Sequence, residues 1–348
     1  MSFLEFLQQI GHNPALLITA LLTLGATMLN GVTDAANAIA TCISTRAITP
    51  KKATIMAATF NILGVIIMTL LNGTVAFTIM KMVDFGDQTN YALIALCASL
   101  VGILIWSTFA WIFGIPTSGS HALVAGLTGA AIAVHGNFSG INGSEWIKVI
   151  YGLVLSTLLG FSFGWITVKL IELICRKMDY RKTKSFFKRG QIIGGAAVAF
   201  MHGAQDGQKF IGIFVLGTYL ASGVSNLSNI TVPLWIIITC ALLMGLGTTI
   251  GGYRIIKKVG MGMVKLEKYQ GFATDIAAAS CLLITSLYGI PVNTTHTKTT
   301  AIMGVGAAKR LSNVKWNVVK DMGLTWILTF PGCGLIGFII AKLFLSIF

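Results

Sequence analysis

Charged residues are scarce in this sequence. Asp, Glu, Lys and Arg make up 10% of its 348 residues, whereas a typical soluble domain carries about 25%. A chain of this length has too few charges to cover a water-exposed surface, which argues against a cytosolic enzyme or a disordered protein. Hydrophobic residues make up 55% and the mean hydropathy is +0.82. The composition therefore predicts an all-α polytopic protein that lies in a lipid bilayer.

Cysteine clusters and acid–base clusters are also lacking. The six cysteines are scattered, with no C-x-x-C pair and no Cys/His cluster, so we expect neither a disulfide framework nor a zinc site. No clear nucleophile–base pair stands out, and we expect neither an enzyme nor a cofactor. The N-terminus contains Glu5 and no basic stretch, so we expect no cleaved signal peptide.

A net charge of +14 could indicate a protein that binds nucleic acid, but the placement of the charged residues indicates a membrane protein. Most Lys and Arg residues stand in short connections between long apolar runs, which is the pattern of membrane topology. We therefore expect no nucleic-acid partner. The apolar runs predict membrane-spanning or near-spanning helices at 14–45, 53–80, 91–113, 118–135, 147–173, 191–222, 231–252, 269–288, 297–308 and 321–347.

The connections fall into two sets by charge. Basic residues crowd into 46–52, 174–190, 254–268 and 309–320, while 81–90, 136–146 and 223–230 hold a single lysine. The positive-inside rule makes the first set cytoplasmic and the second external. We therefore expect a multi-pass plasma-membrane protein with both termini external. The basic 174–190 segment is the expected cytoplasmic linker between halves at 1–173 and 191–348.

Two motifs occur twice, in the same order. Residues 114–121 (GIPTSGSH) recur at 289–296 (GIPVNTTH), and residues 30–34 (NGVTD) recur at 202–206 (HGAQD). The charge map gives the two copies opposite directions across the membrane. The sequence therefore predicts an inverted-topology repeat with interrupted helices and two re-entrant-type Gly-Ile-Pro helical hairpins, an architecture typical of secondary transporters.

The Gly-Ile-Pro segments are candidate anion sites. Proline stops the preceding helix, and the Ser, Thr and Asn residues that follow can cap the next one. The N-terminus of a helix inside the membrane offers backbone N–H groups and a positive dipole end to an anion. An alternative is that these side chains only satisfy kinked backbone. The predicted anion-contacting residues are Thr117, Ser118, Ser120, Asn293, Thr294 and Thr295.

Asp34 and Asp206 stand in the middle of predicted spans. A carboxylate at the bilayer centre costs about 2.5–3.5 kcal/mol on insertion scales, so it needs a reason. Each is open to four roles: ligand of a coupling cation, carrier of a proton, acceptor for a substrate hydroxyl, or structural tie between helices. Asn30 and Asn37 are expected to help complete a sodium shell.

Five further polar residues have two readings each. Lys209 takes the repeat position of Asn37, and it either balances Asp206 or contributes charge to an anion. Asp275 is a candidate cation or gating residue, with an interfacial carboxylate as the alternative. Lys298 is expected to snorkel toward the cytoplasm, with a place near the anion as the alternative. His121 and His296 are expected to brace the hairpins by hydrogen bonds rather than to titrate in transport.

At these motifs the sequence resembles the inorganic phosphate transporter (PiT) family over residues 20–345. That family carries a duplicated G-A-N-D-type signature, which reads GVTDAANA at 31–38 and GAQDGQK at 203–209 here, and a P-x-S-x-[ST]-H-like hairpin in each half. Thr33 and Gln205 replace the signature asparagines, and Asn293 stands where a serine is usual. Sodium coupling is less secure if those asparagines normally bind the ion.

The resemblance implies a symporter that imports inorganic phosphate by alternating access, with sodium or protons as the coupling ion. It places phosphate between the hairpin tips and adds Gln208 to the expected site, with Asp34, Asp206, Gln208 and Lys209 near phosphate and sodium at Asp34 or Asp206. A sulfate or related oxyanion permease and an anion channel remain alternatives. Buried carboxylates favour phosphate, because hydrogen phosphate can donate a proton to them and sulfate cannot. A homodimer stays open.

Overall fold

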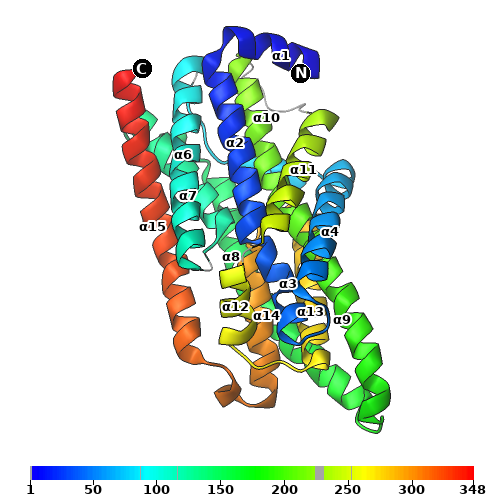
Figure 1. Cartoon of the computed structure of the whole chain (residues 1–348). Helices are drawn as coiled ribbons and strands as arrows, with labels where there is room; N and C mark the ends of the chain where they lie inside the picture. The colour runs from blue at the N-terminus through cyan, green and yellow to red at the C-terminus, as the bar shows by residue number, and fades with distance from the viewer. Residues whose placement is uncertain (1, 87, 116, 224–230, 252) are drawn as a thin grey trace.

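The computed structural model describes residues 2–86, 88–115, 117–223, 231–251 and 253–348, and every regular element in those ranges is helical (Figure 1). Asp87, Pro116 and the 224–230 part of an expected external connection lie outside the described residues. The elements are α1 (Phe3–His12), α2 (Pro14–Thr33), α3 (Ala35–Ser44), α4 (Pro50–Leu71), α5 (Thr74–Met80), α6 (Thr89–Phe113), α7 (Gly119–His135), η1 (Phe138–Gly140), α8 (Gly143–Ile174), α9 (Tyr180–His202), η2 (Gly203–Gly207), α10 (Gln208–Ala221), α11 (Leu234–Ile250), α12 (Tyr253–Gly262), α13 (Lys268–Leu287), α14 (Thr294–Lys309), η3 (Leu311–Asn313) and α15 (Trp316–Ile347).

Both expected interruptions of long helices are present. α2 ends at Thr33 and α3 begins at Ala35, but Asp34 keeps a helical backbone conformation and its N–H donates to the Asn30 carbonyl at 2.9 Å. The interruption at Asp34 is therefore a local distortion within one helical segment, Pro14–Ser44. In the second half, α9 and α10 are joined by η2, a π-helical turn that contains Asp206. π-helical turns widen the backbone ring and are frequent at functional sites. The polar, glycine-flanked centres of these runs therefore interrupt the helices as the sequence predicts.

Other boundaries differ from the expected spans. The apolar run 53–80 is split at Asn72 and Gly73 into α4 and α5. Asn72 causes the split: its Oδ1 accepts from the backbone N–H of Thr74 at 3.1 Å, and its Nδ2 donates to the Leu287 carbonyl at 3.2 Å. The expected linker 174–190 contains the start of α9, and α12 forms within the connection expected at 254–268.

The two broken helices run in opposite directions (Figure 1). α2 descends from the end that carries both termini to the middle of the molecule, and α3 continues downward. α9 starts at the opposite end and rises into α10. The α6–α7 hairpin lies in the half of the molecule near the termini, and α13 and α14 lie in the other half. The N-termini of α7 and α14 therefore approach the centre from opposite ends.

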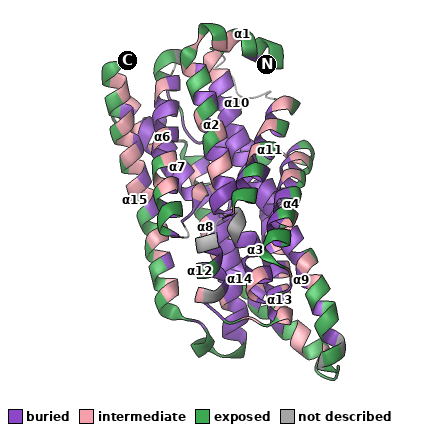
Figure 2. Cartoon of the chain, viewed as in Figure 1, coloured by how far each residue is buried: buried purple, intermediate pink, exposed green. Residues whose placement is uncertain are grey.

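Six described helical segments have the length and composition to cross a membrane. These are Pro14–Ser44, Pro50–Leu71, Asn90–Phe113, Gly143–Ile174, Lys268–Leu287 and Trp316–Ile347, with Gly119–His135 and Leu234–Ile250 as shorter apolar helices. Large side chains such as Leu158, Leu328 and Ile339 point outward, while the buried residues gather along the middle of the bundle (Figure 2). An apolar exterior around a partly polar interior suits a protein in lipid.

Candidate anion and cation site

The turns that lead into α7 and α14 have the same construction. Gly114 and Gly289 adopt left-handed backbone conformations at φ 62° and 64°, which glycine reaches without steric cost. Ser118 Oγ then accepts the His121 N–H at 2.9 Å, and Asn293 Oδ1 accepts the Thr295 N–H at 2.9 Å. Ser118 and Asn293 are thus the N-caps of the two short helices.

The two helix N-termini meet in the protein interior. The His121 and His296 rings lie edge to face with centroids 4.6 Å apart, and each ring also packs on an aromatic side chain of α15. His121 contacts Phe330 at 4.5 Å and His296 stacks on Trp326 at 3.6 Å. The histidines were expected to brace the hairpins by hydrogen bonds, but His121 Nδ1 and both ring nitrogens of His296 have no hydrogen-bond partner among the described residues. The contacts of these rings are instead aromatic packing contacts.

A buried ion pair ties the two hairpins to η2 and α10. Lys209 Nζ donates to Asp206 Oδ1 at 2.6 Å, to Ser120 Oγ at 2.5 Å and to the Val292 carbonyl at 2.6 Å. Asp206 also accepts from Ser120 Oγ at 3.3 Å and from Thr294 Oγ1 at 3.0 Å. One carboxylate and one ammonium therefore contact both tips at once.

Asp34 lies beside the first hairpin, with different partners. Its Oδ2 accepts from the Gly119 N–H and from Asn30 Nδ2, both at 3.2 Å. Asn37 Nδ2 donates to Thr295 Oγ1 at 2.8 Å, which connects the α3 segment to the second hairpin. The amide oxygens Asn30 Oδ1 and Asn37 Oδ1 are buried without a hydrogen-bond partner among the described residues.

The remaining predicted residues are spread around this centre. Thr117 is buried at the first turn. Gln208 turns toward the α4–α5 break, where its Nε2 donates to the Asn72 carbonyl at 2.9 Å, so the structure does not bring it to the hairpin tips. Sequence reasoning overlooked His202, whose Nε2 lies 3.2 Å from Asp206 Oδ2. Its place opposite Asn30 in the repeated motif was the available signal.

Asp275 belongs to a second buried cluster. Its Oδ1 accepts from Thr41 Oγ1 at 2.6 Å and pairs with Lys298 Nζ. Lys298 also donates to Thr41 at 3.1 Å and is 1% exposed. The expectation that Lys298 snorkels to the membrane surface is therefore wrong. Asp275 lies 23 residues away along the chain and neutralises the lysine inside the bundle.

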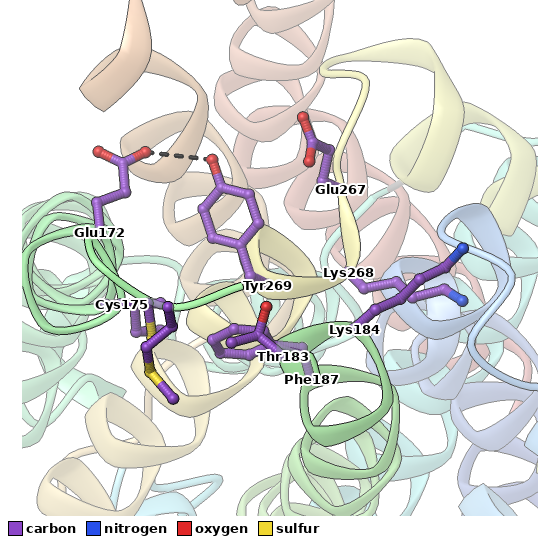
Figure 3. A pocket seen from close by; sticks show the side chains of 10 residues that line it. Glu172, Cys175, Thr183, Lys184, Phe187, Glu267, Lys268 and Tyr269 are labelled. Carbon is purple, nitrogen blue, oxygen red and sulfur yellow. Dashed lines mark hydrogen bonds between the residues drawn. The ribbon is translucent and has the colours of Figure 1, made fainter. Parts of the chain in front are cut away.

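A cavity of about 200 Å³ lies apart from these clusters, where the end of α8 meets the starts of α9 and α13 (Figure 3). Charges of both signs line it, including Glu172, Lys184 and Lys268, and Tyr269 donates to Glu172 Oε1 at 3.2 Å. None of the hairpin residues contributes to its wall.

The helical fold and the buried polar centre define a polytopic membrane protein built around broken helices. Residues 30–337 match the family model described as the phosphate transporter family. The chain belongs to that family.

Named relatives and a solved structure are similar to this chain. It is 38% identical to the "Probable low-affinity inorganic phosphate transporter" of Bacillus subtilis, over 87% of this chain and 89% of that protein. A protein of the same name from Rhizobium meliloti is 36% identical, over 88% of this chain and 90% of that one. A solved structure, "The sodium-dependent phosphate transporter", superposes with a TM-score of 0.88 and 23% identity, over 97% of this chain and 100% of that one. This last likeness supports the fold.

Proposed function

We propose that this protein is a cation-coupled secondary transporter that imports inorganic phosphate by alternating access. The observation that carries the proposal is the buried Asp206–Lys209 pair, which contacts the N-terminal ends of both α7 and α14. Because the Asp206–Lys209 pair contacts both hairpin tips, an anion bound beside this pair would also contact both tips. Family membership supplies the substrate class.

In this proposal phosphate binds between the tips. Its oxygens accept from the hydroxyls of Ser120, Thr294 and Thr295 and from N–H groups at the starts of α7 and α14. The N–H groups of Gly119, His121 and Thr295 already donate to Asp34, Ser118 and Asn293, so the anion uses the others. Lys209 supplies positive charge beside the anion. Asp206 accepts the proton of hydrogen phosphate, which sulfate cannot supply, so the site discriminates between the two oxyanions.

The need for coupling follows from membrane electrostatics. Moving one elementary negative charge inward against 100 mV costs about 2.3 kcal/mol. A cation that binds with phosphate offsets this cost. Asp34 with the amide oxygens of Asn30 and Asn37 is the proposed place for it, since these oxygens are buried and the amide oxygens are unpaired.

The test is uptake of labelled phosphate into proteoliposomes at fixed membrane potential, with an inward sodium gradient, an inward proton gradient, or neither. We expect accumulation above equilibrium under one of the two gradients, with little competition from excess sulfate. Asp206→Asn is expected to abolish accumulation. Flux that only equilibrates phosphate under every gradient would point to a channel, and strong inhibition by sulfate would overturn the choice of substrate.

A further inference from the structure

Positions that correspond in the repeated motifs make matching contacts. Asn30 approaches Asp34 Oδ2 at 3.2 Å, and its counterpart His202 approaches Asp206 Oδ2 at 3.2 Å. The backbone N–H of Gly119 donates to Asp34 Oδ2, and the hydroxyl at the corresponding position, Thr294, donates to Asp206 Oδ2. The two aspartates therefore occupy equivalent places.

The contacts that cross between hairpins match as well. Asn37 donates to Thr295 Oγ1 in the second hairpin at 2.8 Å, and its counterpart Lys209 donates to Ser120 Oγ in the first at 2.5 Å. Thr295 and Ser120 hold the same position in the GIPTSGSH and GIPVNTTH motifs. The two halves therefore place residues at equivalent positions, but the side chains at those positions differ.

The chemistry differs at the two positions that contact the aspartates or the opposite hairpin. Around Asp34 these positions carry the amides of Asn30 and Asn37, whose buried oxygens have no hydrogen-bond partner among the described residues. Gln205 Oε1 and Gln208 Oε1 are also without such a partner, but the amides of these side chains donate to the Ile290 and Asn72 carbonyls and not to Asp206. Around Asp206 the two positions carry His202 and Lys209, which have no oxygen to offer a cation. A lysine ammonium has three donors and no acceptor.

The Lys209 ammonium occupies a position where oxygen atoms could bind a metal cation. Its Nζ lies within 2.6 Å of a carboxylate oxygen, a hydroxyl oxygen and a carbonyl oxygen, which is the kind of oxygen set that binds hard cations. Two positive charges at this spot would repel each other in a site that is buried from water. The ammonium therefore excludes a dissolved cation from the Asp206 half.

We infer that this transporter has one coupling-cation site, at Asp34 with Asn30 and Asn37, and that Lys209 is a resident counter-ion that replaces a second cation at Asp206. The inference rests on the proposed function. The occupant of the single site is a metal cation of the sodium type rather than a proton, because a carboxyl O–H uses only one acceptor, whereas a metal cation uses several oxygen ligands at once.

The first test is binding of radiolabelled sodium to the intact protein in nanodiscs, with and without inorganic phosphate. We expect the wild type to hold about one sodium ion per chain, and its phosphate uptake to depend on sodium with a Hill coefficient of about 1. Asn37→Lys gives the first half the chemistry of the second and is expected to lose sodium binding. Lys320→Asn, an exposed lysine on α15, is the matched control and should bind sodium as the wild type does.

The second test gives the second half the two asparagines that the first half carries at positions 30 and 37. The double variant Lys209→Asn, His202→Asn is expected to bind about two sodium ions, with a Hill coefficient of uptake that rises toward 2. If this variant does not fold, the wild-type count and Asn37→Lys decide the matter. Two ions in the wild type, sodium retention by Asn37→Lys, or a folded double variant that still binds one ion would each overturn the inference.

The inference and the proposed function fail in different ways. Uptake driven by a pH gradient with no sodium binding would overturn the single sodium site and leave cation-coupled phosphate import standing. Phosphate that never accumulates under either gradient would overturn the proposed function, whatever the sodium count.

Discussion

At the scale of single residues, the interior charges are balanced in two different ways. Asp206 and Asp275 each face a buried lysine, whereas Asp34 faces an amide and a backbone N–H. A buried ion pair adds little net stability over a well-packed apolar pair, but removal of one partner leaves an uncompensated charge. The paired aspartates are therefore more sensitive to loss of their partners than Asp34 is.

Lys298→Met tests this at the cluster that lies away from the hairpin tips. We expect the variant to lower the free energy of unfolding by about 3–5 kcal/mol, because Asp275 would keep a buried charge with no lysine beside it. The double variant Lys298→Met, Asp275→Leu should recover most of that loss. Thermal unfolding in detergent measures both, and Lys320→Met on the exposed face of α15 is the control. A single variant as stable as the wild type would contradict the pairing.

Gly119 places the first hairpin directly against Asn30 and Asp34, the proposed cation site. A Cβ at this position would lie 2.5 Å from Asn30 Nδ2 and 3.0 Å from Asp34 Oδ2. Gly119→Ala is therefore expected to displace both groups and to raise the half-saturating concentration of the coupling cation by about 10-fold, which corresponds to about 1.4 kcal/mol. Uptake at varied cation concentration measures it. Gly323→Ala, where a Cβ meets nothing within 4 Å, should behave as the wild type, and equal behaviour of the two variants would refute the expectation.

At the scale of elements, the hairpins are locked to helices of the opposite half. Gly129 of α7 lies against the backbone of α15, where a Cβ would come within 2.0 Å of the Gly334 carbonyl. Gly304 of α14 lies in the same way against the Phe161 carbonyl of α8, also at 2.0 Å. Close approach of helix backbones through small residues is how membrane bundles pack. Each hairpin therefore depends on a helix from the other half of the chain.

Gly304→Leu is expected to disrupt this packing. The added side chain cannot fit between two helix backbones, so α14 must move away from α8, at a cost of about 1–3 kcal/mol or more. We expect a smaller monodisperse fraction in size-exclusion chromatography and a lower unfolding temperature. Gly323→Leu puts the same side chain into open space on α15 and should change neither quantity. A wild-type profile for Gly304→Leu would show that α8 and α14 are not in close contact.

The breaks in the helices show what a sequence can predict and where it stops. The interruptions at Asp34 and at η2 were predictable because polar, glycine-flanked motifs sit in otherwise apolar runs. The expected span 53–80 ran through the break at Asn72 and Gly73 because the flanking residues are apolar, although an Asn-Gly pair is itself a turn signal. Asn72 Oδ1 accepts from the Thr74 N–H locally, and its Nδ2 donates to the Leu287 carbonyl, a tertiary contact that the sequence does not show.

Partners of interior charges are equally hidden from the sequence. Helical periodicity puts Lys209 one turn after Asp206, so that pair was a foreseeable alternative. The burial of Lys298 depends on Asp275 and on Thr41, which lies 257 residues before it in the chain. Only the packing of α3 against α13 and α14 brings these side chains together.

At the scale of the whole molecule, the orientation of the chain in the membrane determines which hairpin lies toward the cytoplasm and which lies toward the outside. The two termini lie at one end and the start of α9 at the other (Figure 1). The basic residues of 176–189 belong to the α9 end. The positive-inside rule predicts that this end is cytoplasmic, which would place α6–α7 in the external half and α13–α14 in the cytoplasmic half.

Cysteine labelling in intact cells tests this orientation. Among the native cysteines Cys175 is partly exposed and the other five are buried, so Cys175→Ser provides a quiet background. In it we expect Ser144→Cys and Phe348→Cys to react with a membrane-impermeant thiol reagent from outside, and Lys184→Cys only after permeabilisation. The reverse pattern would contradict the assignment and exchange the roles of the hairpins. If the protein imports phosphate as proposed, the expected orientation predicts that the α13–α14 tip separates from the Asp206–Lys209 pair for inward release while the α6–α7 tip stays closed.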